Sequence, residues 1–179
     1  MKKISIIAVL LAFCLLFAAC KESAETPSTQ TPTDASGVPV ETEPQKITFR
    51  RNGATVTLPG NFTDFSEAPV GKPYAFLYAD PLVGLFGIEE SKETVDESVT
   101  SLETYAAYRA SLVGGEAMEQ DGLWTLSYED NTQNEVQNMV CAFYETESAY
   151  WTIQSYCTWD CFETSEEVMW SYVKAVTFE

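Results

Sequence analysis

Short runs of alternating apolar and polar residues begin near residue 46 and are separated by turn residues. In residues 54–58, Ala, Val and Leu alternate with two threonines, and this period of two is typical of a half-buried strand. Ile47–Phe49 predicts a partner strand, because Arg51–Gly53 between the two segments has the composition of a turn. We therefore expect a hairpin at the start of the folded region.

Apolar runs of strand length recur through the rest of the chain, after an expected loop at 60–72. Asp80-Pro81 joins the first two runs, and the polar segments 130–135 and 145–148 are suited to hairpins between the last three. The five predicted strands are Tyr74–Ala79, Leu82–Glu89, Leu123–Glu129, Val136–Glu145 and Ala149–Cys157.

Two segments have helical periodicity, and each has a capping-box sequence at its start. The first box is Thr100–Glu103, with Thr100 and Glu103 as the reciprocal pair, and Gly114-Gly115 ends that helix. The second box is Thr164–Glu167. The residues expected on the buried faces are Leu102, Tyr105, Ala106, Leu112 and Val113 in the first helix, and Met169, Tyr172, Val173 and Val176 in the second. This order of elements predicts an α+β fold, an antiparallel sheet of about six to seven strands flanked by two main helices.

The N-terminal residues have the anatomy of a secretory signal. Lys2 and Lys3 precede an uncharged run, Ile4–Phe17, and small residues follow it. The run is shorter than the roughly 20 apolar residues that a membrane-spanning helix needs. The segment Leu16-Phe17-Ala18-Ala19-Cys20 resembles the lipobox of bacterial lipoproteins, although Phe17 stands where leucine is usual. The resemblance implies cleavage after residue 19 and lipidation of Cys20, and the alternative is a freely secreted protein.

The composition divides the remaining chain in two. Residues 21–45 are rich in Thr, Ser, Pro and Glu and contain no aromatic residue, so we expect a disordered tether spanning on the order of 25–30 Å. Residues 46–179 are long enough for one domain with its own core. The prediction is a signal at 1–19, a lipidated cysteine and tether at 20–45, and a single globular domain at 46–179, anchored outside the cytoplasm on the bacterial cell membrane.

Several segments of the domain look like the PsbP-like α/β/α sandwich. The resemblance is carried by VTLPGNF, GIEES, SLETYAAYRASL, GLWTLSY, YWTIQSYC and VKAVTFE, from Ile47 to Glu179. The PsbP-like group includes small secreted lipoproteins beside photosystem and nuclear-import subunits. The resemblance implies an antiparallel sheet with helices on its faces, in a family of non-enzymatic binding and assembly factors.

The charge balance limits the classes of partner that the protein can bind. The chain has 10 Lys and Arg against 27 Asp and Glu, a formal net charge of −17, and removal of the signal leaves 8 basic residues and a charge of −19. This excludes nucleic acid and docking on anionic lipid through a basic patch. Solubility alone is an alternative explanation for the excess of acidic residues.

The sequence contains no histidine, which removes Ser-His and Cys-His catalysis and the usual zinc ligands. No phosphate loop, GxSxG or SxxK motif is present. Paired-carboxylate hydrolysis stays open, although no two acids stand out. Asp130–Glu135 faintly resembles a calcium loop but lacks its glycine and distant glutamate, which favours a solvated turn. We expect no enzyme activity, no cofactor and no metal.

Aromatic residues are dense in the domain, and core packing accounts for most of them. Strand parity places Trp151 and Ile153 on one face of their strand and Tyr150 and Tyr156 on the other. If that second face is only partly covered, Tyr150 and Tyr156 form a candidate binding platform for a peptide or glycan.

Three functions fit these observations. The first is a membrane-anchored interaction or assembly module with an unknown protein partner. The second is a lipoprotein that binds a small ligand or glycan, and the third, weakest one is a carboxylate-dependent envelope hydrolase. A deep apolar cleft with convergent polar groups would favour the second function, and a flat exposed patch would favour the first.

Three cysteines lie in the domain: Cys141, Cys157 and Cys161. Cys141 shares strand parity with Met139 and Phe143, so we expect a buried, inert thiol. A turn centred on 146–147 puts Cys141 about 16 Å along the strand from the partner of Cys157, too far for a disulfide. We predict a Cys157–Cys161 disulfide at the turn into the last helix, with three free thiols as the alternative. Thiol counting on denatured protein purified without reductant distinguishes one reactive thiol from three.

The substitution Cys20→Ala tests the anchor. We expect the variant to be released from membranes or to remain unprocessed, because the thiol that carries the lipid is gone. Cell fractionation with immunoblotting measures this. A variant that matures normally and stays with the membranes contradicts the lipoprotein prediction.

Overall fold

The structure is a computed structural model that describes residues 45–67, 74–131 and 136–179. The chain divides into two units, 1–42 and 43–179, and every described residue belongs to the second. The predicted signal, Cys20 and all of the tether except Gln45 therefore lie outside the described residues.

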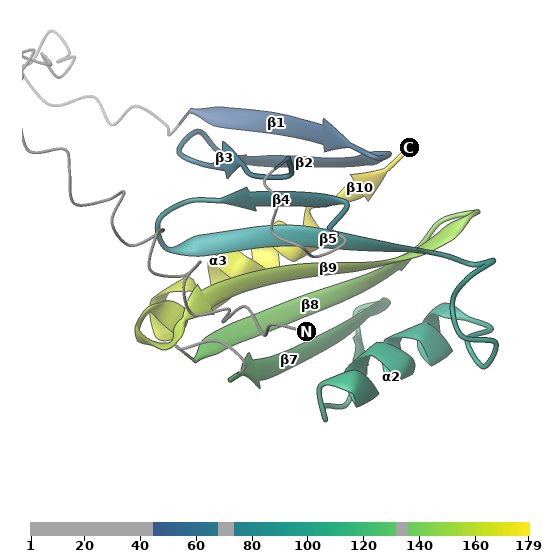
Figure 1. Cartoon of the computed structure of the whole chain (residues 1–179). Helices are drawn as coiled ribbons and strands as arrows, with labels where there is room; N and C mark the ends of the chain where they lie inside the picture. Colours follow the sequence, from purple (N-terminus) through teal and green to yellow (C-terminus); the bar gives the residue numbers. More distant parts are fainter. Residues whose placement is uncertain (1–44, 68–73, 132–135) are drawn as a thin grey trace, which may run out of the picture. The chain divides into compact units, whose positions relative to one another are not determined.

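The described elements follow one another along the chain as short strands, a helix, three longer strands and a second helix (Figure 1). They are β1 (Lys46–Arg51), β2 (Ala54–Pro59), β3 (Thr63–Asp64), β4 (Phe76–Ala79), β5 (Val83–Ser91), α2 (Leu102–Leu112), β6 (Met118–Gln120), β7 (Leu123–Asp130), β8 (Gln137–Glu145), β9 (Ala149–Thr158), a 3₁₀ turn (Trp159–Cys161), α3 (Phe162–Lys174) and β10 (Thr177–Phe178).

A seven-stranded antiparallel sheet forms the centre of the domain, in the order β3-β4-β5-β9-β8-β7-β6. This confirms the predicted α+β class with its antiparallel sheet and two helices. Each of the five strands predicted after residue 73 is present, with ends that differ by a few residues. A second sheet, β1-β2-β10, contains the predicted N-terminal hairpin.

One face of the large sheet packs against α3 and the small sheet, and Figure 1 shows α3 behind the large sheet. Trp151 and Ile153 of β9 are buried on this face with Met169 and Val173 of α3. The small sheet adds Leu58 and aromatic contacts to the same core. These contacts include Phe49 stacked on Tyr78, with ring centroids 4.3 Å apart, and Trp151 against Phe178 at 4.9 Å.

The opposite face packs against α2. Tyr105 of α2 is fully buried and stacks on Tyr150 of β9, with ring centroids 4.8 Å apart. Its hydroxyl donates to Glu90 Oε2 at 2.7 Å and shares a hydrogen bond with Thr152 Oγ1 at 2.8 Å. Arg109 Nη1 donates to the same Glu90 oxygen at 2.7 Å. Burial raises the pKa of Tyr105, so the phenol stays neutral and holds α2 to β5 and β9.

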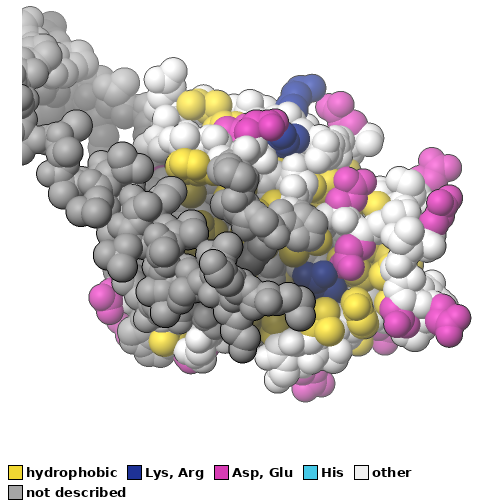
Figure 2. All heavy atoms as spheres, viewed as in Figure 1, with side chains coloured by type: hydrophobic (Ala, Val, Ile, Leu, Met, Phe, Trp, Pro, Cys, Tyr) yellow, Lys and Arg dark blue, Asp and Glu magenta, His cyan; other side chains and the backbone are white. Residues whose placement is uncertain are grey.

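Acidic side chains outnumber basic ones in the domain. On the face seen in Figure 2, Asp and Glu side chains are spread over the domain, whereas Lys and Arg side chains are few. Four of the described basic residues, Arg50, Arg51, Lys92 and Arg109, form ion pairs with acids. Lys92 pairs with Glu145 at 2.7 Å and Arg50 with Glu179 at 3.2 Å.

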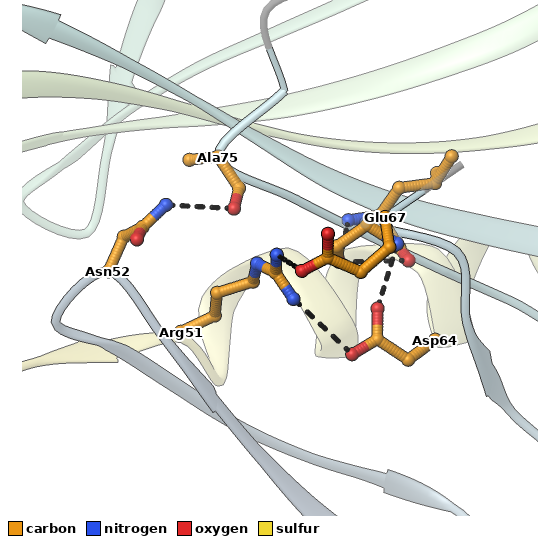
Figure 3. Close-up of polar contacts among 7 residues, drawn as sticks. Arg51, Asn52, Asp64, Glu67 and Ala75 are labelled. Carbon is orange, nitrogen blue, oxygen red and sulfur yellow. Dashed lines mark hydrogen bonds and ion pairs between the residues drawn. The ribbon is translucent and has the colours of Figure 1, made fainter. Parts of the chain in front are cut away.

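Polar contacts tie the N-terminal hairpin to β3 and β4 (Figure 3). Asn52 and Gly53 have φ of 50° and 79° in the hairpin turn, which explains the Asn-Gly sequence there. Asn52 Nδ2 donates to the Ala75 carbonyl at 3.0 Å. Arg51 forms ion pairs with Glu67 and with Asp64, the latter at 3.9 Å. The small sheet is therefore joined to the large one by these contacts as well as by the core.

The predicted helix starts need correction. The N-cap of α2 is Ser101 rather than Thr100, because Ser101 Oγ accepts from the Thr104 N–H while Thr104 Oγ1 accepts from the Ser101 N–H. Thr104 thus has the role in the capping box that was predicted for Glu103. At the C-terminal end of the helix, Leu112 and Val113 were predicted to be buried but are exposed, because the buried contacts of α2 end before them.

The last helix begins earlier than predicted. α3 starts at Phe162, after Cys161 as a cap without a side-chain hydrogen bond, so Thr164–Glu167 lies inside its first turns. Thr164 Oγ1 instead donates back to the Cys161 carbonyl at 3.0 Å. The predicted apolar face is correct at Met169 and Val173, which are buried, whereas Tyr172 is only partly buried and the buried Val176 lies after the end of the helix. Neither helix in the described part of the chain is long and apolar enough to cross a membrane.

The substitution Tyr105→Phe tests the polar attachment of α2. We expect a loss of about 1–2 kcal/mol in the free energy of unfolding, because Glu90 and Thr152 lose a buried hydrogen-bond partner. Urea denaturation followed by circular dichroism measures it. Tyr108→Phe on the same helix is the matched control, expected within about 0.5 kcal/mol of wild type. Equal stability of both variants would show that the phenol contributes nothing.

Candidate functional site

The helix α2 is too short to cover its face of the sheet. At about 1.5 Å per residue its 11 residues span about 16 Å, whereas seven strands spaced about 4.8 Å apart extend over nearly 30 Å. The buried residues under α2 include Leu126, Cys141, Phe143 and Tyr150. The same face continues beyond them toward the other ends of β7, β8 and β9.

A hollow with a volume of about 360 Å³ lies on this uncovered part of the face. It is formed by side chains from β4, β5, β7, β8 and β9, together with Tyr74 just before β4. We call it the aromatic hollow; its described lining residues are Tyr74, Leu77, Phe86, Ile88, Tyr128, Asp130, Gln137, Met139, Gln154 and Tyr156.

Strand register explains why these residues meet. Across four adjacent strands, Gly84 lies opposite Tyr156, Tyr156 opposite Met139, and Met139 opposite Tyr128. A Cβ added at Gly84 would overlap the Tyr156 ring. The glycine therefore lets that ring lie over β5, and the row forms a floor at Met139 between two tyrosines.

The rings on the β5 side of the hollow support one another. Tyr74 and Phe86 have centroids 4.6 Å apart, and Phe86 and Tyr156 have centroids 6.0 Å apart, both in tilted arrangements. Phe86 is 7% exposed, so its position is fixed by the core, while Tyr156 is half-buried. This wall is held in place by packing before any ligand binds.

Polar groups are placed around the rings. Gln154 Nε2 donates to the Tyr128 hydroxyl and to Cys141 Sγ, both at 3.0 Å, which fixes the Tyr128 side chain. Gln137 lies opposite Asp130 across β8 and β7. No Lys or Arg is among the described residues that line the hollow. The hollow thus combines aromatic faces, two amides and one carboxylate.

Two phenols of the hollow, those of Tyr128 and Tyr156, stay neutral at physiological pH. Burial raises the pKa of Tyr128 to about 12. Burial, and next the neighbouring Tyr74, also raises the pKa of Tyr156. Both groups therefore keep their protons and remain able to donate hydrogen bonds.

The platform predicted from the sequence is half correct. Tyr156 lies in the aromatic hollow, but Tyr150 is 4% exposed because α2 covers it, so Tyr150 is a core residue and no part of a platform. Sequence reasoning missed Tyr74, Phe86 and Tyr128. Tyr128 could have been found from the cross-strand register. Once the position of the β8–β9 turn is known, the register places Tyr128 on the strand next but one to that of Tyr156, in the same row.

The cysteines differ from the prediction at one point. Cys141 is fully buried, as expected, and burial raises the pKa of its thiol to about 12. Cys157 and Cys161 are free thiols in the structure, so the bridge predicted between them is not formed there. Cys157 is buried in the core beneath α3, while Cys161 Sγ accepts from Thr158 Oγ1 at 3.6 Å. The strand continues through Thr158 before the chain turns, and Cys161 is partly buried against the same core that contains Cys157.

No group of three or more Cys, Asp or Glu side chains is placed to hold a metal ion within 45–67, 74–131 and 136–179. Residues 132–135 of the segment that faintly resembles a calcium loop lie outside the described residues.

No protein-family model matches the chain, and no curated protein matches it. Solved structures do. The chain is similar to the solution structure of cyanobacterial PsbP (CyanoP) from Synechocystis sp. PCC 6803, with 14% sequence identity and a TM-score of 0.52 over 75% of this chain and 92% of that one. A crystal structure from Bacteroides thetaiotaomicron VPI-5482 is similar at 8% identity and a TM-score of 0.48, over 77% of this chain and 49% of that one. The likeness to CyanoP confirms the PsbP-like fold and concerns the fold alone.

The raised phenol pKa values predict loss of stability in alkali. Burial raises the pKa of Tyr78, Tyr128 and Tyr144 each to about 12, above the value of about 10 for an exposed tyrosine. The folded state therefore keeps protons that the unfolded chain releases. Their contribution is complete below pH 10 and is lost as the pH rises from about 10 to about 12.

Urea unfolding at intervals from pH 8 to pH 11.5 measures this decline, and tyrosinate absorbance follows the phenols directly. Tyr128→Phe should remove one late-titrating phenol and make the decline shallower. An unchanged decline together with an unchanged absorbance titration would contradict the assignment of Tyr128.

Proposed function

We propose that the chain is a lipid-anchored extracytoplasmic module that binds a small ligand or a short chain segment in the aromatic hollow. The observation that carries this proposal is the hollow itself, a concavity of about 360 Å³ with aromatic walls and a few polar groups. Small-molecule sites have this size and character, whereas a protein-docking surface is usually flatter. The aromatic walls and the polar groups around them support ligand binding, although the hollow is shallower than the deep cleft named as the criterion.

The proposed location follows from the N-terminal sequence. The lipobox-like segment ending at Cys20 supports lipid attachment, and residues 21–45 supply a polar tether. A tether of that length holds the domain and its hollow clear of the membrane surface. The net charge supports the exclusion of nucleic acid and of direct docking on anionic lipid.

We propose that the module is not an enzyme. Glycoside hydrolysis by a carboxylate pair needs two acids about 5–9.5 Å apart across the bound substrate. Asp130 is the one carboxylate among the described residues that line the aromatic hollow. With no histidine in the chain, the hollow also lacks the common general base.

An interaction or assembly module is the second candidate, and one surface feature favours it. Leu112 and Val113 at the end of α2 and Met118 on β6 are 61%, 42% and 56% exposed. Three large apolar side chains this exposed within seven residues of sequence would suit contact with a partner protein.

Saturation-transfer NMR with four probes tests the ligand-binding proposal. The probes are an N-acetylglucosamine tetramer, a proline-rich peptide, choline and inorganic phosphate. We expect at least one of the first three to bind and phosphate not to bind, because no basic group is described in the hollow. Tyr156→Leu should weaken that binding by about threefold to tenfold through loss of ring contact.

Trp170→Leu on α3, at the opposite face of the sheet, is the matched control and should bind as wild type does. Gly84→Ala is a second test, since it displaces the Tyr156 ring without removing it. No binding by any probe, or binding that both Tyr156→Leu and Gly84→Ala leave intact, would contradict the proposal.

A further inference from the structure

The large sheet has an open edge beside the aromatic hollow. β6 is the outer neighbour of β7, but it pairs only with Leu123–Thr125, the first three residues of that strand. Before β6, the Gly115 N–H bonds back to the Ala110 carbonyl at 3.0 Å, so the chain there belongs to the end of α2 and not to the edge. The second half of β7, up to Asp130, therefore pairs with β8 alone among the described strands (Figure 1).

The register shows which backbone groups face this edge. β6 and β7 are joined by a two-residue turn, Asp121-Gly122, with φ of 55° and 79°. In such a turn the flanking residues, here Gln120 and Leu123, form a hydrogen-bonded pair. Successive residues of an antiparallel strand direct their backbone groups to opposite neighbours, so the odd-numbered residues of β7 face the side of β6. Ser127 and Glu129 thus direct their N–H and C=O groups to the open edge.

The side chains at this edge differ between the two faces of the sheet. Ser127 and Glu129 are exposed, and Ser127 lies opposite Val140, which belongs to the core beneath α3. Tyr128 lies on the other face, in the lining of the aromatic hollow. Glu129 has no ion-pair partner among the described residues. An added strand would place one side chain beside Tyr128 and the next beside Glu129.

We propose that the open edge of β7, Ser127–Asp130, binds an extended peptide of a partner protein as an added antiparallel strand, with an apolar residue beside Tyr128 and a Lys or Arg beside Glu129. Backbone hydrogen bonds to Ser127 and Glu129 would hold the strand, and its alternate side chains would give selectivity. This inference goes beyond the proposed function, since it needs the edge of the sheet and no ligand in the hollow.

The charge of the domain favours a basic peptide over a second copy of the chain. Residues 46–179 contain 7 basic and 22 acidic residues, a net charge of −15. This field attracts a cationic segment, and opposite charges on paired strands stabilise the pairing. A second copy would bring two domains of the same sign together, each with Glu129 at the shared edge, which is unfavourable.

Three hexapeptides of equal charge test the strand addition. The parent is acetyl-Val-Lys-Val-Lys-Val-Lys-amide, and the other two carry N-methyl groups on the lysines or on the valines. With valine beside Tyr128 in an antiparallel register, the lysine backbones face β7, so methylation there should weaken binding at least about tenfold. Methylation of the valines, whose N–H groups face solvent, should change the affinity by less than about threefold. NMR titration of the ¹⁵N-labelled mature chain, residues 20–179 without the lipid, measures the affinities at low salt.

Hydrogen exchange locates the added strand. Near saturation, the parent peptide should slow exchange of the Ser127 and Glu129 amides at least about threefold, because their N–H groups gain partners. The Tyr128 amide, which faces β8, should change little.

Two pairs of variants separate the backbone from the charge. Ser127→Pro removes an N–H that faces the edge and should weaken binding at least about fivefold, whereas Ser127→Ala keeps it and should bind as wild type does. Glu129→Lys should weaken binding of the parent peptide about threefold or more. Glu97→Lys, at an exposed position in the loop between β5 and α2, makes the same change in net charge and should have a smaller effect. Circular dichroism checks that each variant is folded, and the comparison of the peptides needs no variant.

Equal binding of the two methylated peptides would show attraction of charge alone and overturns the inference. Protection of Ser127 and Glu129 that rises with protein concentration in the absence of peptide also overturns it, because a second copy then occupies the edge. No measurable binding at about 5 mM parent peptide has the same consequence. Tyr156→Leu, which tests the hollow, should leave peptide binding unchanged, so failure of this inference and failure of the proposed function are distinguishable.

Discussion

Strand β9 is buried on both of its faces, and the arrangement of the domain follows from this constraint. It pairs along its length with β5 on one side and β8 on the other. Trp151 and Ile153 require cover on one face, which α3 and the small sheet provide together. Tyr150 requires cover on the other face, which α2 and the loop before it provide. Because α2 is short, the end of β9 that carries Tyr156 is left as the wall of a hollow.

The position of α2 is fixed by polar contacts as well as by packing. The Tyr105 phenol is buried, and without partners its burial would cost about 1–3 kcal/mol. Glu90 and Thr152 satisfy it, and Arg109 neutralises Glu90 from the same helix. A shift of α2 along the sheet would break these contacts together. The helix therefore cannot slide toward Tyr156 at low cost, and the uncovered half of the face is a stable feature of the fold.

The sequence predicted the fold better than the site, for physical reasons. Period-two and helical patterns depend on local geometry, so both helices and the longer strands were found, whereas the short strands β3, β6 and β10 were not predicted. The caps were misplaced because Thr100, Ser101 and Thr104 can all act as hydrogen-bonding caps, and tertiary contacts select among them. The β8–β9 register was displaced by two residues, since Asn138 rather than Val136 lies opposite Cys157. The extent of α2 over Tyr150 and Tyr156 depends on long-range packing, which no local pattern contains.

The parts of the hollow that would contact a ligand are held before binding occurs. The Tyr156 ring lies over Gly84 and beside Phe86, and Tyr128 is fixed by the Gln154 amide. Immobilising a free side chain at an interface costs about 0.5–1.5 kcal/mol, so rings that are already fixed avoid most of that loss. A rigid sheet is thus compatible with the ligand binding that we propose for a shallow site with few polar groups. For such a shallow site, we expect selectivity to depend on the aromatic faces and polar groups of its described lining residues more than on the depth of the hollow.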